Sequence, residues 1–372
     1  MQQPAVDVLV IGGGVIGCAV VFELAEAGLR VRLLDGRRPG AGASQASAGV
    51  LAPYVEGHDS RPLRVLGRRS LDLYDAFVAR AVERSGLPIG FARCGTLEVA
   101  VTGDDTKRLQ RARTMIAAEQ VTGHWLEAQA LRTAEPALHP GVLGALRIPA
   151  HAAVNVPAMT SALAAAAVAR GAEVVSGVAA TSVALTTDGL VVQTSAGPMH
   201  AVQVVLAAGA WAAALAPEGA DHVPVRPVRG QLLYLATPPG TLRHIVWASD
   251  VYLVPWGDGT VLVGATSEDV GFDERATARG VAQLLNAATA LVPALADATF
   301  VEARHGLRPG SPDDLPYIGR SEVLPGLIYA CGHYRNGALL APLTAVLVRQ
   351  IAQGDETDPA LAAVAPSRAG RL

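Results

Sequence analysis

The sequence predicts an α/β fold in which a doubly wound domain is interleaved with an antiparallel, sheet-rich α+β domain. Three observations support this prediction. The chain of 372 residues begins with one complete β-α-β unit. Between residues 224 and 263 the apolar runs give way to alternating apolar and polar residues. A buried strand and a helix then return near the C-terminus. Insertions into one doubly wound domain explain this order better than two domains in tandem.

The N-terminal β-α-β unit occupies residues 7–35. The run 7–11 (DVLVI) is apolar without alternation, as expected of a strand buried on both faces. Residues 18–27 have the spacing of an apolar helix face, and Gly28 suits the position after a helix end. A second buried strand at 31–34 ends at Asp35.

The remaining elements are predicted in chain order. Residues 40–49 are small and polar and indicate a loop, and Gly257-Asp258-Gly259 indicates a hairpin turn. Helices are expected at 63–84, 104–119, 157–170 and 337–353, and strands at 96–101, 174–175, 183–192, 202–206, 231–235, 252–255 and 327–330. The first domain is expected to comprise residues 1–87, 148–221 and 303–372, and the second 88–147 and 222–302.

Composition excludes several classes of function. The net charge of −3 argues against nucleic acid as a partner, and no apolar run reaches the ~20 residues that span a bilayer. Lys107 is the only lysine, so the arginine excess is attributed to codon bias. The three cysteines have no zinc spacing, so no metal is expected. The N-terminus lacks the basic region of a signal peptide, and a cytoplasmic location is expected.

A dinucleotide fingerprint follows the first strand. Gly12-x-Gly14-x-x-Gly17 allows a tight turn, close approach of a pyrophosphate and close packing of helix on strand. Asp35 ends the second strand, where an acid can bind ribose hydroxyls. The fingerprint alone does not separate FAD from NAD. A second Gly-rich strand–helix at the C-terminus favours FAD, since its helix can point its positive end at the flavin.

Several segments carry a family resemblance. They are residues 12–17, 44–51, 251–255 (VYLVP), 305–319 (HGLRPGSPDDLPYIG) and 331–342 (CGHYRNGALLAP). With them the chain resembles, nearly end to end, the glycine oxidases of the thiamine-biosynthesis type, a branch of the D-amino-acid oxidase family of flavoenzymes. The resemblance implies a Rossmann-like FAD-binding domain of the glutathione-reductase type and an antiparallel-sheet substrate domain.

The resemblance also implies an activity. Glycine, sarcosine or small D-amino acids would lose hydride from Cα to flavin N5, which gives an imine, then glyoxylate and ammonia (or an amine), and hydrogen peroxide from O2. No side chain is implied as an acid or base. A homotetramer and a functional link to a thiazole synthase in thiamine biosynthesis are implied as well.

The substrate carboxylate calls for a guanidinium fork, for which Arg308 and Arg335 are the candidates. Alternatively, Arg308 forms a structural salt bridge and Arg335 ties down a loop. Tyr252 corresponds to the family tyrosine that contacts the carboxylate, although a tyrosine on such a strand can also be a packing residue. Val50, Ser267 and Asp250 stand where family members often carry other residues, so they are candidates for altering the pocket.

The resemblance assigns FAD contacts residue by residue. They are Gly12, Gly14, Val15, Gly17, Asp35, Ala43, Ser44, Ala48, Gly49, Val50, Ala180, Gly209, Gly332, His333, Arg335, Asn336, Gly337, Ala338 and Leu339. Some related enzymes bind flavin through a cysteine, but the matching position here is near Gly306. Non-covalent FAD is therefore expected, with Cys331 as a small buried residue.

Two other functions stay open on sequence alone. One is a dehydrogenase of D-amino or imino acids that uses an acceptor other than oxygen. The other is a flavin-binding subunit without amine chemistry of its own, against which the pair Arg308 and Arg335 argues.

Overall fold

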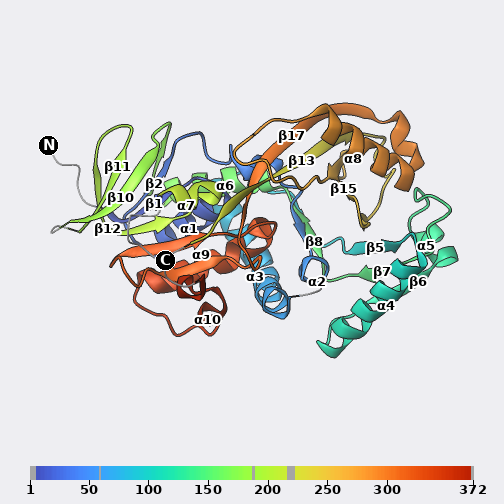
Figure 1. The fold of residues 1–372 in the computed structure, drawn as a ribbon, viewed down its shortest axis with the longest axis horizontal. Coiled ribbons are helices and arrows are strands. Elements are labelled where there is room, and N and C mark those ends of the chain that lie inside the picture. The colour runs from blue at the N-terminus through green and yellow to red at the C-terminus, as the bar shows by residue number, and fades with distance from the viewer. Residues whose placement is uncertain (1–5, 58–59, 187–188, 216–222, 370–372) are drawn as a thin grey trace.

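Two large sheets, at opposite ends of the molecule, organise the fold (Figure 1). The computed structural model describes residues 6–57, 60–186, 189–215 and 223–369. Strand β1, at the start of the described chain, and helix α10, near its end, lie in the same half, so the chain leaves this half and returns to it.

The first sheet has the doubly wound arrangement. Its central strand β1 lies between β2 and β12, parallel to both, and β19 continues the parallel set beside β12. The strands are β1 (Val6–Ile11), β2 (Val31–Asp35), β9 (Glu173–Ser176), β10 (Ala180–Thr186), β11 (Gly189–Thr194), β12 (Met199–Leu206), β18 (Tyr317–Arg320) and β19 (Leu327–Cys331). Strands β1, β2 and β19 are buried, as is the second half of β12, and they consist of near-continuous apolar runs.

Four helices pack together beside this sheet: α1 (Val15–Glu26), α3 (Arg61–Ser85), α6 (Val156–Ala169) and α9 (Gly337–Ala352). Helices α1 and α3 each pack against both α6 and α9. Phe22 of α1 meets Phe77 of α3 edge to face, with ring centroids 5.7 Å apart. These helices and one face of the sheet share the largest apolar core.

The second sheet is almost wholly antiparallel. Its order is β17-β13-β16-β15-β14-β5-β7-β6, and only β14 and β5 run parallel. The strands are β5 (Thr96–Ala100), β6 (His124–Glu127), β7 (Gly144–Ile148), β13 (Arg226–Ala236), β14 (Ile245–Trp247), β15 (Tyr252–Pro255), β16 (Thr260–Gly264) and β17 (Thr299–Gly310). Helices α4 (Gly103–Ala118), α5 (Ala128–Ala134) and α8 (Ala278–Leu291) accompany it.

Short elements complete the described chain. A three-stranded sheet joins β3 (Val50–Leu51), β8 (Ala152–Val154) and β4 (Phe91–Ala92). The short helices are α2 (Pro53–Glu56), α7 (Ala212–Leu215), α10 (Leu361–Val364) and the 3₁₀ turns η1 (Ala43–Ala46), η2 (Gly209–Trp211), η3 (Pro293–Asp297) and η4 (Pro366–Ala369).

Local chemistry sets several helix ends. Asn155 caps α6 by accepting the Ala158 N–H at 3.0 Å. Thr102 and Asp105 form a reciprocal capping box at the start of α4. Gly86, with φ +68°, closes α3 in the left-handed region that favours glycine.

The fold class predicted from sequence is confirmed, whereas several elements escaped prediction. Helix α8 and strands β7, β14 and β17 were not expected, and α1 begins at Val15 rather than near residue 18. The domain limits stay a prediction. Strand β17 runs through the boundary proposed at residue 303, and the one at 221/222 lies outside the described residues.

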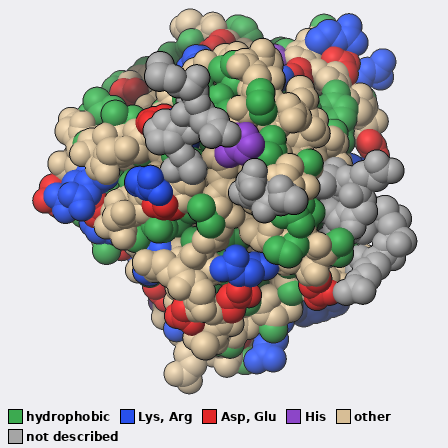
Figure 2. All heavy atoms as spheres, turned by 90° about the vertical axis from the view of Figure 1, so that its left-hand side faces the viewer, with side chains coloured by type: hydrophobic (Ala, Val, Ile, Leu, Met, Phe, Trp, Pro, Cys, Tyr) green, Lys and Arg blue, Asp and Glu red, His purple; other side chains and the backbone are tan. Residues whose placement is uncertain are grey.

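Three further observations concern the surface and the composition of the described residues. On the face that Figure 2 shows, acidic and basic side chains are interspersed rather than gathered by sign. Among the helices of the described ranges, none combines the length and the apolar character needed to cross a membrane. Within the same ranges, no three His, Cys, Asp or Glu residues cluster as metal ligands would.

Candidate functional site

One cavity of about 540 Å³ lies between the two sheets. Its first half is lined at the carboxyl ends of parallel strands, by Ile11, Asp35 and Ala207. Its second half is lined by Tyr252 on β15 and Arg308 on β17. Ligands of doubly wound sheets bind at such strand ends, so this position is the expected one for a cofactor.

The glycine turn between β1 and α1 leaves no room for side chains at two positions. A Cβ on Gly12, whose φ is +108°, would lie 2.4 Å from the Ala207 carbonyl oxygen. A Cβ on Gly17 would lie 1.8 Å from the Gly12 carbonyl oxygen. Gly14 differs, because its Cβ would meet only the Ser44 Oγ, at 3.4 Å, on the cavity side. Gly12 and Gly17 therefore allow close packing of the backbone around the turn. Gly14 leaves the space beside it to the cavity.

Two side chains brace this turn. Asp35 accepts the Gly13 N–H at 2.6 Å and the Arg37 N–H at 2.7 Å. Ser44, on η1, accepts the Val15 N–H at 2.9 Å. These bonds fix the loop that carries the first amides of α1, and both side chains also line the cavity.

The residues present fit FAD. Helix α1 begins at the cavity, and its first amide, that of Val15, donates to Ser44. Its next amides and its positive end would face an anion such as pyrophosphate. Helix α9 also begins there, through Gly337 and Ala338, and has no side-chain cap. Asp35 lies at the end suited to a ribose. A cavity lined by two helix N-termini and an acid meets the demands of a dinucleotide.

Most residues assigned to FAD line the cavity. These are Gly12, Gly14, Val15, Asp35, Ala43, Ser44, Ala48, Gly49, Val50, Ala180, Gly209, His333, Arg335, Gly337 and Ala338. Gly17, Gly332, Asn336 and Leu339 do not line it. Asn336 and Leu339 are buried behind the wall, so their contribution is to packing.

No reactive cysteine faces the site. Cys331 lines the cavity, but burial raises the pKa of its thiol to about 12, so the thiol stays protonated. Cys18 is likewise buried, with a pKa raised to about 12. A Cβ on Gly306 would lie 2.8 Å from the Cα of Ala43, which leaves no space for a cysteine there. These positions offer no thiolate for covalent attachment, so FAD would be held without a covalent bond.

Arg308 and Tyr252 meet at the second half of the cavity. Arg308 Nη1 donates to the Thr266 carbonyl at 2.9 Å. Burial raises the pKa of the Tyr252 hydroxyl, against the opposing effect of the Arg308 guanidinium. The hydroxyl therefore stays protonated and can donate. The Tyr252 ring also stacks on Trp247, with centroids 4.7 Å apart.

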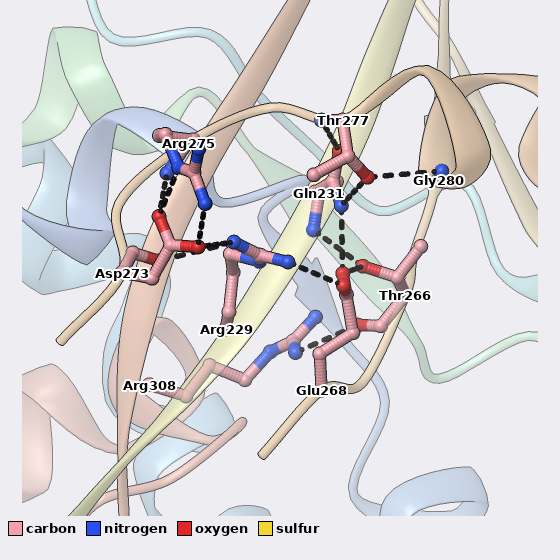
Figure 3. Close-up of polar contacts among 9 residues, drawn as sticks. All are labelled: Arg229, Gln231, Thr266, Glu268, Asp273, Arg275, Thr277, Gly280 and Arg308. Carbon is pink, nitrogen blue, oxygen red and sulfur yellow. Dashed lines mark hydrogen bonds and ion pairs between the residues drawn. The ribbon is translucent and has the colours of Figure 1, made fainter. Parts of the chain in front are cut away.

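A polar network holds the segment that contacts Arg308 (Figure 3). Thr266 Oγ1 accepts the Gln231 N–H at 2.9 Å and donates to Glu268 at 2.6 Å. Glu268 also pairs with Arg229 at 2.7 Å, and Arg229 is only 4% exposed. The network anchors residues 266–268 to β13 and so fixes the carbonyl that orients Arg308.

Glu56, at the end of α2, is a lining residue that sequence reasoning missed. Burial raises the pKa of its carboxyl, and the guanidiniums of Arg335 and Arg308 oppose that rise. Asp35 is the other acid along this cavity wall, as far as the structure describes it, and it lies at the opposite half. The Glu56 carboxyl therefore interacts electrostatically with the guanidiniums of Arg335 and Arg308.

Glu56→Gln should tighten the binding of acetate about threefold to tenfold, because a carboxylate that competes for the same guanidiniums is lost. Protonation of Glu56 has the same effect. Acetate affinity of the unmodified protein should therefore rise as the pH falls toward the raised pKa of Glu56, and this Glu56-linked rise should vanish in the variant. Titration of the FAD absorption bands measures both. The exposed-site control Glu83→Gln should behave as the parent, and weaker acetate binding in Glu56→Gln would contradict the prediction.

His333 lines the cavity as a neutral side chain. Burial lowers its pKa to about 3, and Nε2 lies 2.9 Å from Thr344 Oγ1. In the unfolded chain the imidazole takes up a proton near pH 6.5. The unfolded state therefore binds more protons between pH 6.5 and 3, and stability falls as the pH falls through this range.

The free energy of unfolding of the parent falls between pH 7 and pH 5.5. In His333→Asn this fall should be smaller by about 1 kcal/mol. Urea unfolding at both pH values, with FAD at one fixed excess, measures the difference. His200→Asn is the control, because His200 is exposed. An equal acid loss in His333→Asn and the parent would show that His333 is not the group responsible.

Three other assigned residues have different positions. Arg335 lines the cavity but is exposed, with its guanidinium over the Tyr334 ring. Asp250 is exposed between β14 and β15, and Ser267 is exposed after β16. Neither Asp250 nor Ser267 lines the cavity. Trp247, Ala265, Leu307 and Tyr334, which no sequence argument singled out, do line it.

Comparison with known proteins agrees with this geometry. The family DAO, described as FAD dependent oxidoreductase, matches residues 7–351. The glycine oxidase of Geobacillus kaustophilus is 37% identical over 353 residues, with 94% of each chain covered. Its crystal structure superposes with a TM-score of 0.96 over 98% of this chain and 99% of that one. A bifunctional protein ThiO/ThiG of a Nostoc species is 37% identical over 361 residues; the match covers 95% of this chain and 54% of that relative.

Proposed function

The chain belongs to the DAO family of FAD-dependent oxidoreductases, and we propose that it oxidises glycine and other small amines that carry a carboxylate. The observation that carries the proposal is the guanidinium of Arg308 beside the Tyr252 hydroxyl, in the same cavity as the glycine turn. One cavity thus offers a place for FAD and a fork for a carboxylate.

The chain's own residues bind and orient the substrate. Arg308 and Tyr252 would hold the carboxylate, while Arg335 and Glu56 would set the charge around the rest of the amino acid. Apolar side chains such as Leu307 and Trp247 would limit access of water. FAD, when bound, would supply a two-electron acceptor for the C–H bond that breaks, with O2 as the final acceptor and hydrogen peroxide as its product. The imine that leaves would hydrolyse to glyoxylate and ammonia.

A link to thiamine biosynthesis is part of the proposal. The matched relative from Nostoc is named a bifunctional ThiO/ThiG protein, and this chain aligns with 54% of its length. A functional link to a thiazole synthase is therefore proposed. The homotetrameric state and the cytoplasmic location stay predictions.

Anaerobic mixing of the purified flavoprotein with glycine, sarcosine, D-alanine and D-proline tests the reaction and ranks the substrates. Bleaching of the flavin by glycine is the expected result, and no bleaching by any of the four would refute the proposal. Peroxide release under air then separates an oxidase from a dehydrogenase. Bleaching without peroxide would assign the electrons to another acceptor.

A further inference from the structure

Arg308 and Tyr252 each lie directly over the backbone of a glycine. A Cβ on Gly230 would lie 2.3 Å from both Cζ and Nη1 of Arg308. A Cβ on Gly264 would lie 2.3 Å from Cζ and 2.4 Å from the hydroxyl oxygen of Tyr252. Real side chains do not approach that closely, so each polar group occupies the volume that any other residue would fill.

We propose that Gly230 and Gly264 are positioning residues. Because they have no side chain, the Arg308 guanidinium and the Tyr252 hydroxyl can lie against the strand backbone, and this sets where the two groups contact the substrate carboxylate. The inference rests on the proposed function. The strand register puts all four residues on one face of the sheet. Gly264 is directly opposite Tyr252, and Arg308 is opposite Val228, two residues before Gly230.

A left-handed backbone does not account for glycine at these two positions. Neither Gly230 nor Gly264 has the positive φ that favours glycine. Both lie within paired strands, where glycine weakens a sheet because it has no side chain to pack. The atoms that an added Cβ would meet are the ends of side chains rather than backbone. The fold can accommodate alanine by displacing those side chains, so the site is affected more than the sheet.

Arg308 is held from its other side as well. Its Nη1 donates to the Thr266 carbonyl, and Thr266 is fixed by Gln231 and Glu268 (Figure 3). A guanidinium pushed off Gly230 would therefore lose this bond, since the carbonyl cannot follow it. The arrangement allows one position for the fork, which is the condition for bidentate recognition.

The test compares Gly230→Ala and Gly264→Ala with Gly257→Ala. Gly257 lies in the turn between β15 and β16, and a Cβ there would meet nothing within 4 Å. The dissociation constant of acetate, followed by FAD absorption, should rise at least about tenfold in Gly230→Ala and about threefold in Gly264→Ala. Bound FAD per chain should stay at the parent level, and Gly257→Ala should match the parent in both measurements.

A double-variant cycle shows whether Gly230 acts through Arg308. Gly230→Ala added to Arg308→Ala should not weaken acetate binding further, and a further loss would overturn the inference. If Gly230→Ala alone yields no flavoprotein, the double variant should restore the yield. Failure to restore it would assign Gly230 to the backbone and overturn the inference.

The proposed function and this inference fail in different ways. A parent protein that neither binds acetate nor bleaches with glycine refutes the proposed function, and this inference with it. A parent that does both, together with a Gly230→Ala variant of unchanged acetate affinity, overturns the inference alone.

Discussion

Replacing Arg308 by alanine is expected to lower kcat/KM for glycine about a hundredfold to a thousandfold, equivalent to ~3–4 kcal/mol of lost binding in the transition state. The loss is large because the guanidinium is half-buried in the cavity and aligned by the Thr266 carbonyl. No second guanidinium takes its place over Gly230 in the described structure. The rate of flavin bleaching at a series of glycine concentrations, measured without oxygen, gives the value.

Arg308→Lys and Arg226→Ala are the comparisons that make this result specific. Lysine keeps the charge but not the planar fork, so its loss should be smaller, about tenfold to thirtyfold. Arg226 begins the neighbouring strand β13 and pairs with Asp269 on the surface, so its removal should leave the rate within about twofold. An Arg308→Ala variant as fast as the parent would mean that the carboxylate binds elsewhere.

Gly17→Ala is expected to abolish FAD binding and to destabilise the fold, whereas Gly14→Ala should weaken FAD binding alone. The Cβ of the first variant would lie 1.8 Å from a backbone oxygen, so α1 must move away from β1. The Cβ of the second would meet only Ser44 Oγ at 3.4 Å and would stand in front of the first amides of α1. A dissociation constant for FAD raised about tenfold to a hundredfold is expected for Gly14→Ala.

Flavin content after gel filtration and thermal unfolding of the apoprotein separate the two effects. Gly17→Ala should lower the melting temperature of the apoprotein by several degrees, and Gly14→Ala should not. Gly103→Ala provides the control, because the first residue of α4 has open space around its Cβ. Full flavin content in Gly17→Ala would contradict the role assigned to the glycine turn.

Local signals explain what could be predicted from the sequence. The β1-α1-β2 unit is specified within 30 consecutive residues, by two apolar runs and a turn in which Gly12 and Gly17 leave no room for a side chain. Helix α9 was predicted from its apolar residues, although Pro342 lies inside it. Arg308 and Tyr252 were found through their motifs, which are also contiguous in the chain.

The rest of the cavity wall depends on pairing between distant segments. Glu56 enters it because α2 packs against α3, and Trp247 because β14 pairs with β15. No local pattern reports such contacts. Ser267 and Asp250 show the same limit, since a shift of one residue along an extended chain reverses the direction of a side chain. The neighbouring Thr266 is buried, while Ser267 is exposed.

The position of the last strand and helix has a consequence for synthesis of the protein on the ribosome. Strand β19 (Leu327–Cys331) completes the parallel set beside β12, and α9 (Gly337–Ala352) packs on α1. Helix α1 is therefore synthesised more than 300 residues before α9, the helix that packs on it. Until α9 emerges, the nascent chain exposes the part of α1 that packs on α9, and such apolar surfaces aggregate or recruit chaperones. Non-local closure of this kind also slows folding after release.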